Sequence, residues 1–146
     1  MNIKEYLDTH DTLTFNTKGV SMLPMIKQDR DLVILRKKQP DERLKKYDVA
    51  MYHAKDGRYL LHRIVALEEN GYTFLGDNLP HKERHIREEQ VFAVLVGFVH
   101  KGKEYQTDDF GYRVYYHVHY FLYPLRFVYL KIRPFGSKIK RKLTGR

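Results

Sequence analysis

Two glycine-containing dipeptides, Asp56-Gly57 and Asn70-Gly71, constrain the fold of this chain more than any other sequence feature. Each stands between short runs that are rich in β-branched and aromatic residues. Both dipeptides tolerate the positive φ values that tight hairpin turns need. The middle of the chain is therefore predicted to form antiparallel hairpins.

Strands are also predicted along most of the chain up to about residue 110. The runs expected to form strands are 31–36, 48–52, 58–66, 72–75 and 91–100. Gly97 is expected to mark a bulge or a close approach in the last of these. Before the tail only residues 2–8 look helical. Short strands joined by turns are typical of a mainly β domain, here with antiparallel strands in two packed or coiled sheets.

Charge divides the chain near residues 107–111. All 18 acidic residues and 18 of the 27 Lys and Arg residues precede residue 111. Residues 111–146 hold the other nine bases and no acid, so they carry the whole formal excess of +9. We therefore expect a β domain over 1–110 and a helical, aromatic and basic C-terminal extension over 111–146.

The extension suits more than one role. Leu125, Val128, Tyr129 and Ile132 recur at helical spacing among basic residues. Such a helix suits the surface of an anionic membrane, through residues 125–146. A helix packed on the β domain fits the sequence equally well, and nucleic-acid binding is the less favoured third reading.

Composition restricts where the protein is expected to act. The 146 residues include no cysteine, which suits a reducing compartment. The N-terminus has no apolar signal region, and no run approaches the roughly 18 apolar residues that would span a bilayer. The expectation is a cytoplasmic protein, with peripheral membrane contact as a hypothesis.

Three motifs follow one another along the β part: Gly19-Val20-Ser21-Met22-Leu23-Pro24, Leu61-His62-Arg63 and Gly76-Asp77-Asn78. A serine hydroxyl is not deprotonated near neutral pH, so it needs an adjacent base in order to attack a carbonyl. Histidine titrates near pH 6.5 and can take that proton and later return it. The pattern therefore favours nucleophilic catalysis by Ser21 with His62 as its base.

In this order the motifs resemble the signal peptidase I family, serine peptidases that remove leader segments from secreted proteins. The resemblance covers about residues 18–103. It is closest to the endoplasmic-reticulum and archaeal-like branch, in which histidine is the general base. It implies antiparallel coiled sheets of the signal-peptidase/LexA-like type, a peptide or preprotein substrate and small side chains before the cut bond. No metal or other cofactor is expected.

The resemblance also implies roles for single residues. Ser21 would be the nucleophile, with its backbone N–H in the oxyanion hole, and His62 the general base and acid. The carboxylate that orients the histidine falls at Glu83, which we favour over Asp77. His81 and His85 are expected on a solvated loop nearby.

Other residues are expected to support the site. The resemblance pairs Asp77 with Arg63, holding two strands together. Gly19 can adopt positive φ before the nucleophile, and Pro24 stiffens the turn after it. Asn78 completes the turn that contains Asp77.

The chain also departs from the family pattern. Gly19 cannot supply the hydroxyl that many bacterial members use as a second oxyanion donor, and Met25 replaces a common threonine. The membrane anchor of the bound enzymes has no counterpart here. A self-cleaving repressor fits poorly, because only 20 residues precede Ser21 and neither Ala-Gly nor Cys-Gly occurs. The remaining alternative is an inactive β domain that serves as a membrane or nucleic-acid adaptor through its basic tail.

Overall fold

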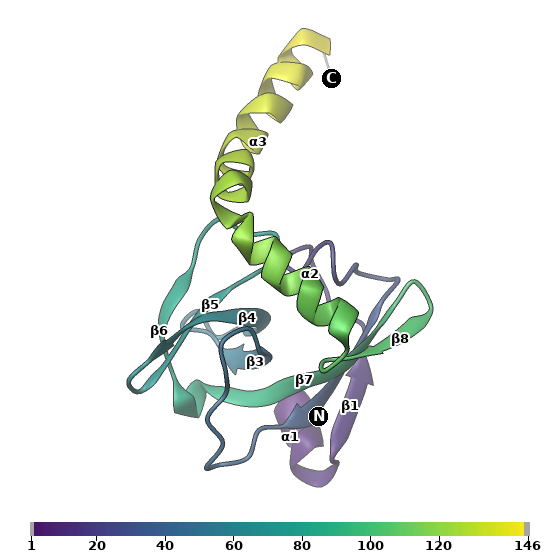
Figure 1. Cartoon of the computed structure of the whole chain (residues 1–146), viewed down its shortest axis with the longest axis vertical. Helices are drawn as coiled ribbons and strands as arrows, with labels where there is room; N and C mark the ends of the chain where they lie inside the picture. Colours follow the sequence, from purple (N-terminus) through teal and green to yellow (C-terminus); the bar gives the residue numbers. More distant parts are fainter. Residues whose placement is uncertain (1, 145–146) are drawn as a thin grey trace.

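The computed structural model describes residues 2–144 and shows a mainly β body with two helices at its C-terminal end (Figure 1). The helices are α1 (Ile3–Thr9), α2 (Phe110–Phe121) and α3 (Tyr123–Thr144), with a short 3₁₀ turn at Glu88–Gln90. The strands are β1 (Thr12–Phe15), β2 (Leu32–Lys37), β3 (Val49–His53), β4 (Tyr59–Glu68), β5 (Gly71–Leu75), β6 (Glu83–Arg87), β7 (Val91–His100) and β8 (Lys103–Gln106).

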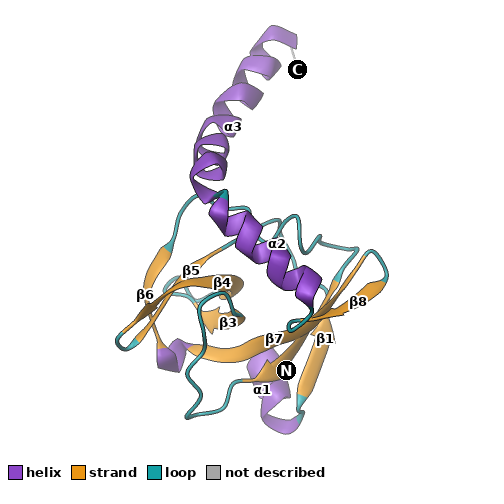
Figure 2. Cartoon of the chain, viewed as in Figure 1, coloured by secondary structure: helices purple, strands orange, loops and turns teal. Residues whose placement is uncertain are grey.

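Within the described residues these strands form a single antiparallel sheet of eight strands (Figure 2). Its order is β1-β2-β7-β3-β4-β5-β6, with β8 paired to β7. Strand β7 is central, because it pairs with β2 on one edge and with β3 and then β8 on the other. The expectation of an antiparallel β body is confirmed, but one continuous curved sheet replaces the two sheets that were expected.

All five expected strands occur, within a few residues of their predicted ends, and the N-terminal helix is also confirmed. That helix begins with reciprocal bonds, in which Asn2 Oδ1 accepts from the Glu5 backbone and Glu5 Oε2 accepts from the Asn2 backbone. Strands β1, β6 and β8 were not predicted. They are four or five residues long. Strands β1 and β6 are the two ends of the strand order, and β8 pairs with only part of β7.

The two glycine dipeptides act in different ways. Gly57 has a φ of +87° in the connection from β3 to β4, as the turn prediction requires. Gly71 instead begins strand β5, so the connection from β4 is Glu69-Asn70. A Cβ atom at Gly71 would lie 2.1 Å from the carbonyl oxygen of Ile86. The hairpin prediction holds, but Gly71 is needed for the close approach of β6 rather than for positive φ.

Two clusters of buried side chains flank the sheet. The first contains Val33, Leu35, Leu61 and Leu95 together with Met22, Met25, Ile26 and Tyr112. The second contains Tyr52, Ile64, Tyr72, Phe74 and Ile86. The loop around Ser21 and the helix α2 both contribute to the first cluster, so both belong to the folded body.

Candidate active site

The loop that carries Ser21 follows strand β1 and is fixed at both ends. Gly19 has a φ of +89°, a conformation that glycine adopts without the steric cost other residues incur. Its backbone N–H donates to Gln28 Oε1 at 2.7 Å. Beyond the serine, Met22 and Ile26 are buried in the first cluster. The loop therefore presents Ser21 from a turn that the core holds in place.

The Gly76-Asp77-Asn78 turn holds the same loop from the other side. The backbone N–H of Asn78 donates to the Ser21 carbonyl oxygen at 2.9 Å, and Asn78 Nδ2 donates to the Val20 carbonyl oxygen at 3.1 Å. A Cβ atom at Gly76 would lie 2.8 Å from the Ser21 carbonyl oxygen. Motifs that are more than 50 residues apart in the sequence are thus brought into contact.

Ser21 itself keeps its reactive groups unoccupied. Neither Ser21 Oγ nor the Ser21 backbone N–H makes a hydrogen bond with any residue in the described part of the chain. The residue is half-buried. A serine that merely stabilises a turn usually bonds to nearby backbone groups through its hydroxyl. Ser21 does not do so.

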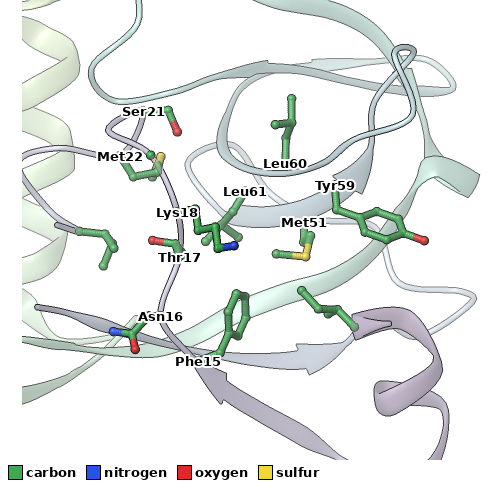
Figure 3. A pocket seen from close by; sticks show the side chains of 13 residues that line it. Phe15, Asn16, Thr17, Lys18, Ser21, Met22, Met51, Tyr59, Leu60 and Leu61 are labelled. Atoms are coloured by element: carbon green, nitrogen blue, oxygen red, sulfur yellow. The ribbon is translucent and has the colours of Figure 1, made fainter. Parts of the chain in front are cut away.

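Ser21 lies at a cavity of about 340 Å³ (Figure 3). Apolar side chains supply most of its lining, among them Phe15, Met22, Met51 and Leu61. Lys18, which the sequence analysis did not single out, lines the same cavity. Ser21 therefore borders a mainly apolar space.

His62 lies in strand β4 and is 4% exposed. Its Nδ1 is 3.0 Å from the Tyr52 hydroxyl, whereas the nearest Glu83 oxygen is 3.9 Å away. Burial lowers the pKa of His62 to about 4, so the ring is neutral at pH 7. No hydrogen bond joins His62 to Ser21 Oγ in the region described, and the dyad stays a prediction.

Tyr52 was missed in the sequence analysis, although the hairpin register contains the signal. Ala50 pairs with His62 and Tyr52 with Leu60, so Tyr52 is a diagonal neighbour of His62 on one face of the sheet. Burial, reinforced by Glu83, raises the pKa of Tyr52 well above its usual value and keeps the hydroxyl protonated. The neutral Tyr52 hydroxyl is therefore the hydrogen-bond partner of His62 Nδ1, and the Glu83 carboxylate lies farther from that nitrogen.

Arg63 and Asp77 form the ion pair that the resemblance implied. Arg63 Nε and Nη2 donate to the two Asp77 carboxylate oxygens, each at 2.9 Å, and both side chains are fully buried. Burial raises the pKa of Asp77, but the Arg63 guanidinium and the hydrogen bond from Tyr120 together hold that pKa below its usual value. Both oxygens of the Asp77 carboxylate therefore accept hydrogen bonds from Arg63 rather than from His62.

Helix α2 covers this ion pair with its aromatic face. Tyr115 and Tyr120 donate to the Asp77 carboxylate at 2.9 and 2.7 Å, and Arg63 donates to the Tyr112 hydroxyl at 2.8 Å. Arg126, at the start of α3, donates to the Asp77 backbone carbonyl at 2.5 Å. The extension is thus partly packed on the β body through these tyrosines, which are three and five residues apart in the sequence.

The acids and histidines after this turn are divided between loop and strand. Glu83 and His85 lie in strand β6, so the expected loop position of His85 is wrong. His85 is solvent-exposed there, with its Nδ1 2.9 Å from Glu68 Oε2. An exposed four- to five-residue edge strand with this much charge has no hydrophobic alternation that would reveal it. His81 lies outside any strand and is exposed.

Comparisons of the chain with protein-family models, with curated proteins and with solved structures found no match.

Proposed function

We propose that this protein is a serine endopeptidase of the signal-peptidase type, with Ser21 as nucleophile and His62 as general base. One observation carries the proposal: a serine whose hydroxyl and backbone N–H have no hydrogen-bond partner among residues 2–144 stands at an apolar cavity, in a loop held by the Gly76-Asp77-Asn78 turn. The substrate would be a leader or signal segment of a larger protein.

The reaction would begin with attack of Ser21 Oγ on the scissile carbonyl while its proton passes to His62 Nε2. The Ser21 N–H would donate to the resulting oxyanion, a contribution worth about a hundred- to a thousandfold in rate. His62 would then protonate the leaving amine, leaving an acyl-enzyme. Water, deprotonated by the same histidine, would release the carboxylate product and restore the serine.

Two features of the site support this assignment of roles. The lowered pKa keeps His62 in its basic form at neutral pH. Tyr52 occupies Nδ1, so the opposite ring nitrogen, Nε2, is the one left for Ser21. Hydrogen bonds between nucleophile and base are often loose before substrate binds and tighten in the complex. The proposal therefore requires that substrate binding bring Nε2 within reach of Oγ.

The chain offers a matched control, because Ser21 and Ser137 are its only serines. Wild type, Ser21→Ala, His62→Gln and Ser137→Ala would be incubated with a leader-peptide library, and products identified by mass spectrometry. We expect cleavage by wild type and Ser137→Ala alone. Cleavage that survives Ser21→Ala would refute the proposal. No cleavage by folded wild type across the library would favour the adaptor function instead.

A further inference from the structure

Six exposed apolar side chains follow one face of α3: Leu125, Val128, Ile132, Phe135, Ile139 and Leu143. Each is between 56% and 81% exposed. Successive members are three or four residues apart, the spacing that places side chains on one face of a helix. We call this set the apolar stripe. Figure 1 shows α3 extending away from the β body.

The stripe continues on α2 without losing its register. Val114, Val118 and Phe121 lie at the same three- and four-residue spacing and are also exposed. At the junction the Leu122 N–H donates to the Val118 carbonyl at 3.0 Å, and the Arg126 N–H donates to that of Leu122 at 3.1 Å. Because the four-residue hydrogen-bond step is kept, the two helices share one outward face.

The opposite face is already used by the fold. Tyr112, Tyr115 and Arg126 contact the Arg63–Asp77 pair, and Leu130 is buried at 7% exposure. At 3.6 residues per turn Tyr112 and Leu130 lie about half a turn away from the stripe, and Tyr115 and Arg126 about a third of a turn. The stripe therefore cannot be covered by the protein's own β body while α2 stays docked. What covers it must come from outside this fold.

Basic residues border the stripe on both sides. Lys131 and Arg133 flank Ile132 in the sequence, and Lys138 and Lys140 flank Ile139. Neighbours in sequence are about 100° apart around a helix, so each of these two isoleucines stands between two bases. There is no Asp or Glu after Asp109. The surface is thus apolar along its centre and positive along both margins.

This arrangement selects one class of partner. A second copy of the same surface would set bases against bases, with no acid from α2 onward to pair with them, so self-association is disfavoured. An anionic bilayer supplies both an apolar layer for the stripe and negative headgroups for its margins. No helix of residues 2–144 is long and apolar enough to cross a membrane. We propose that the apolar stripe and its flanking bases bind the surface of an anionic lipid bilayer, with α3 lying in the interface.

The test uses the full chain and needs no peptidase activity. Sedimentation would be measured with vesicles of phosphatidylcholine containing phosphatidylserine and with vesicles of phosphatidylcholine alone. Ile132→Glu places a charge in the stripe, whereas Ser137→Glu adds the same charge to the same helix away from it. We expect Ile132→Glu to weaken binding about fiftyfold or more, and Ser137→Glu about fivefold. Circular dichroism should show both variants folded, because both positions are exposed.

A second readout reports insertion directly. The chain has no tryptophan, so Ile139→Trp introduces a single indole on the stripe. Its emission should shift to shorter wavelength with the phosphatidylserine vesicles and stay unshifted without them. This measurement keeps the proposal testable if Ile132→Glu does not fold.

Several results would overturn the proposal. If Ile132→Glu and Ser137→Glu weakened vesicle binding equally, charge alone would bind the lipid and the stripe would not insert. Unshifted tryptophan emission from Ile139→Trp that has sedimented with vesicles would mean the same. A stable dimer that Ile132→Glu dissociates, without vesicle binding, would assign the stripe to a second copy. Binding to duplex DNA with a steep salt dependence, without vesicle binding, would assign the bases to nucleic acid.

Discussion

Replacing Asp77 with asparagine should destabilise the protein severely while leaving its chemistry largely intact. The substitution is nearly isosteric, but it leaves the Arg63 guanidinium buried without its counter-charge. Removing one partner of a buried ion pair costs about 3–5 kcal/mol. A chain of 146 residues unfolds with an entropy of about 0.3 kcal/mol per kelvin, so the melting temperature should fall by about 10–16 °C.

The assay is thermal unfolding followed by circular dichroism, compared with peptide cleavage well below the lowered melting temperature. Asp56→Asn is the matched control, because Asp56 pairs with Arg58 at the surface, where both side chains are at least half exposed. That pair should contribute little to stability. The double variant Arg63→Met, Asp77→Leu should recover part of the lost stability, because it removes both charges at once.

Two outcomes would contradict this reasoning. If Asp77→Asn lowered the melting temperature no more than Asp56→Asn, the buried pair would not be the stabilising element that its geometry indicates. If Asp77→Asn remained stable but lost turnover, Asp77 rather than Glu83 would be the carboxylate that serves His62.

Three further predictions follow from the site and the extension. Tyr52→Phe should lower turnover by about tenfold or more, since it removes the Nδ1 partner of His62, and should lower the melting temperature by several degrees, since that buried nitrogen is left unpaired. Glu83→Gln should lower turnover only if Glu83 acts through Tyr52, and turnover by each variant well below its melting temperature tests this. Burial lowers the pKa of His62 to about 4 from 6.5, so protons bind the unfolded chain more tightly and the free energy of unfolding should fall by about 3 kcal/mol from pH 6.5 to pH 4. Denaturant titrations at the two pH values should show a smaller fall for His62→Gln. Ending the chain at Leu130 should leave the melting temperature within a few degrees of wild type, whereas ending it at Asp109 should unfold the β body, because α2 covers a buried ion pair. A chain that ends at Asp109 and keeps native stability would contradict this.

The central strands could be predicted from sequence because local signals and tertiary packing agree there. Strand β7 was predicted with its bounds unchanged, since an apolar run of ten residues buried on both faces carries a strong signal. Strand β6 could not be predicted, because its burial is confined to Ile86 and its neighbours are exposed. Pairing with β5 makes it a strand, and that pairing is not visible locally.

The candidate site shows the same limit. The Arg63–Asp77 pair followed from a family resemblance and is present in the structure. The partner of His62 Nδ1 is Tyr52, which depends on a hairpin register set by the turn at Gly57. Helix α2 was predicted as part of a separate extension, and neither its charge nor its aromatic content shows that tyrosine hydroxyls reach into the β body.

The contacts of Asp77 also set the order in which the site can form during synthesis. The Asp77 carbonyl accepts from His119 and from Arg126, and its neighbour Asn78 holds the backbone of Ser21. A ribosome makes Ser21 well before Arg126, and domains fold as their parts emerge. The Ser21 loop therefore gains its last supporting contacts only after the segment that contains His119 and Arg126 has been made. Until then a nascent chain carries Ser21 without the contacts that support its loop in the folded protein.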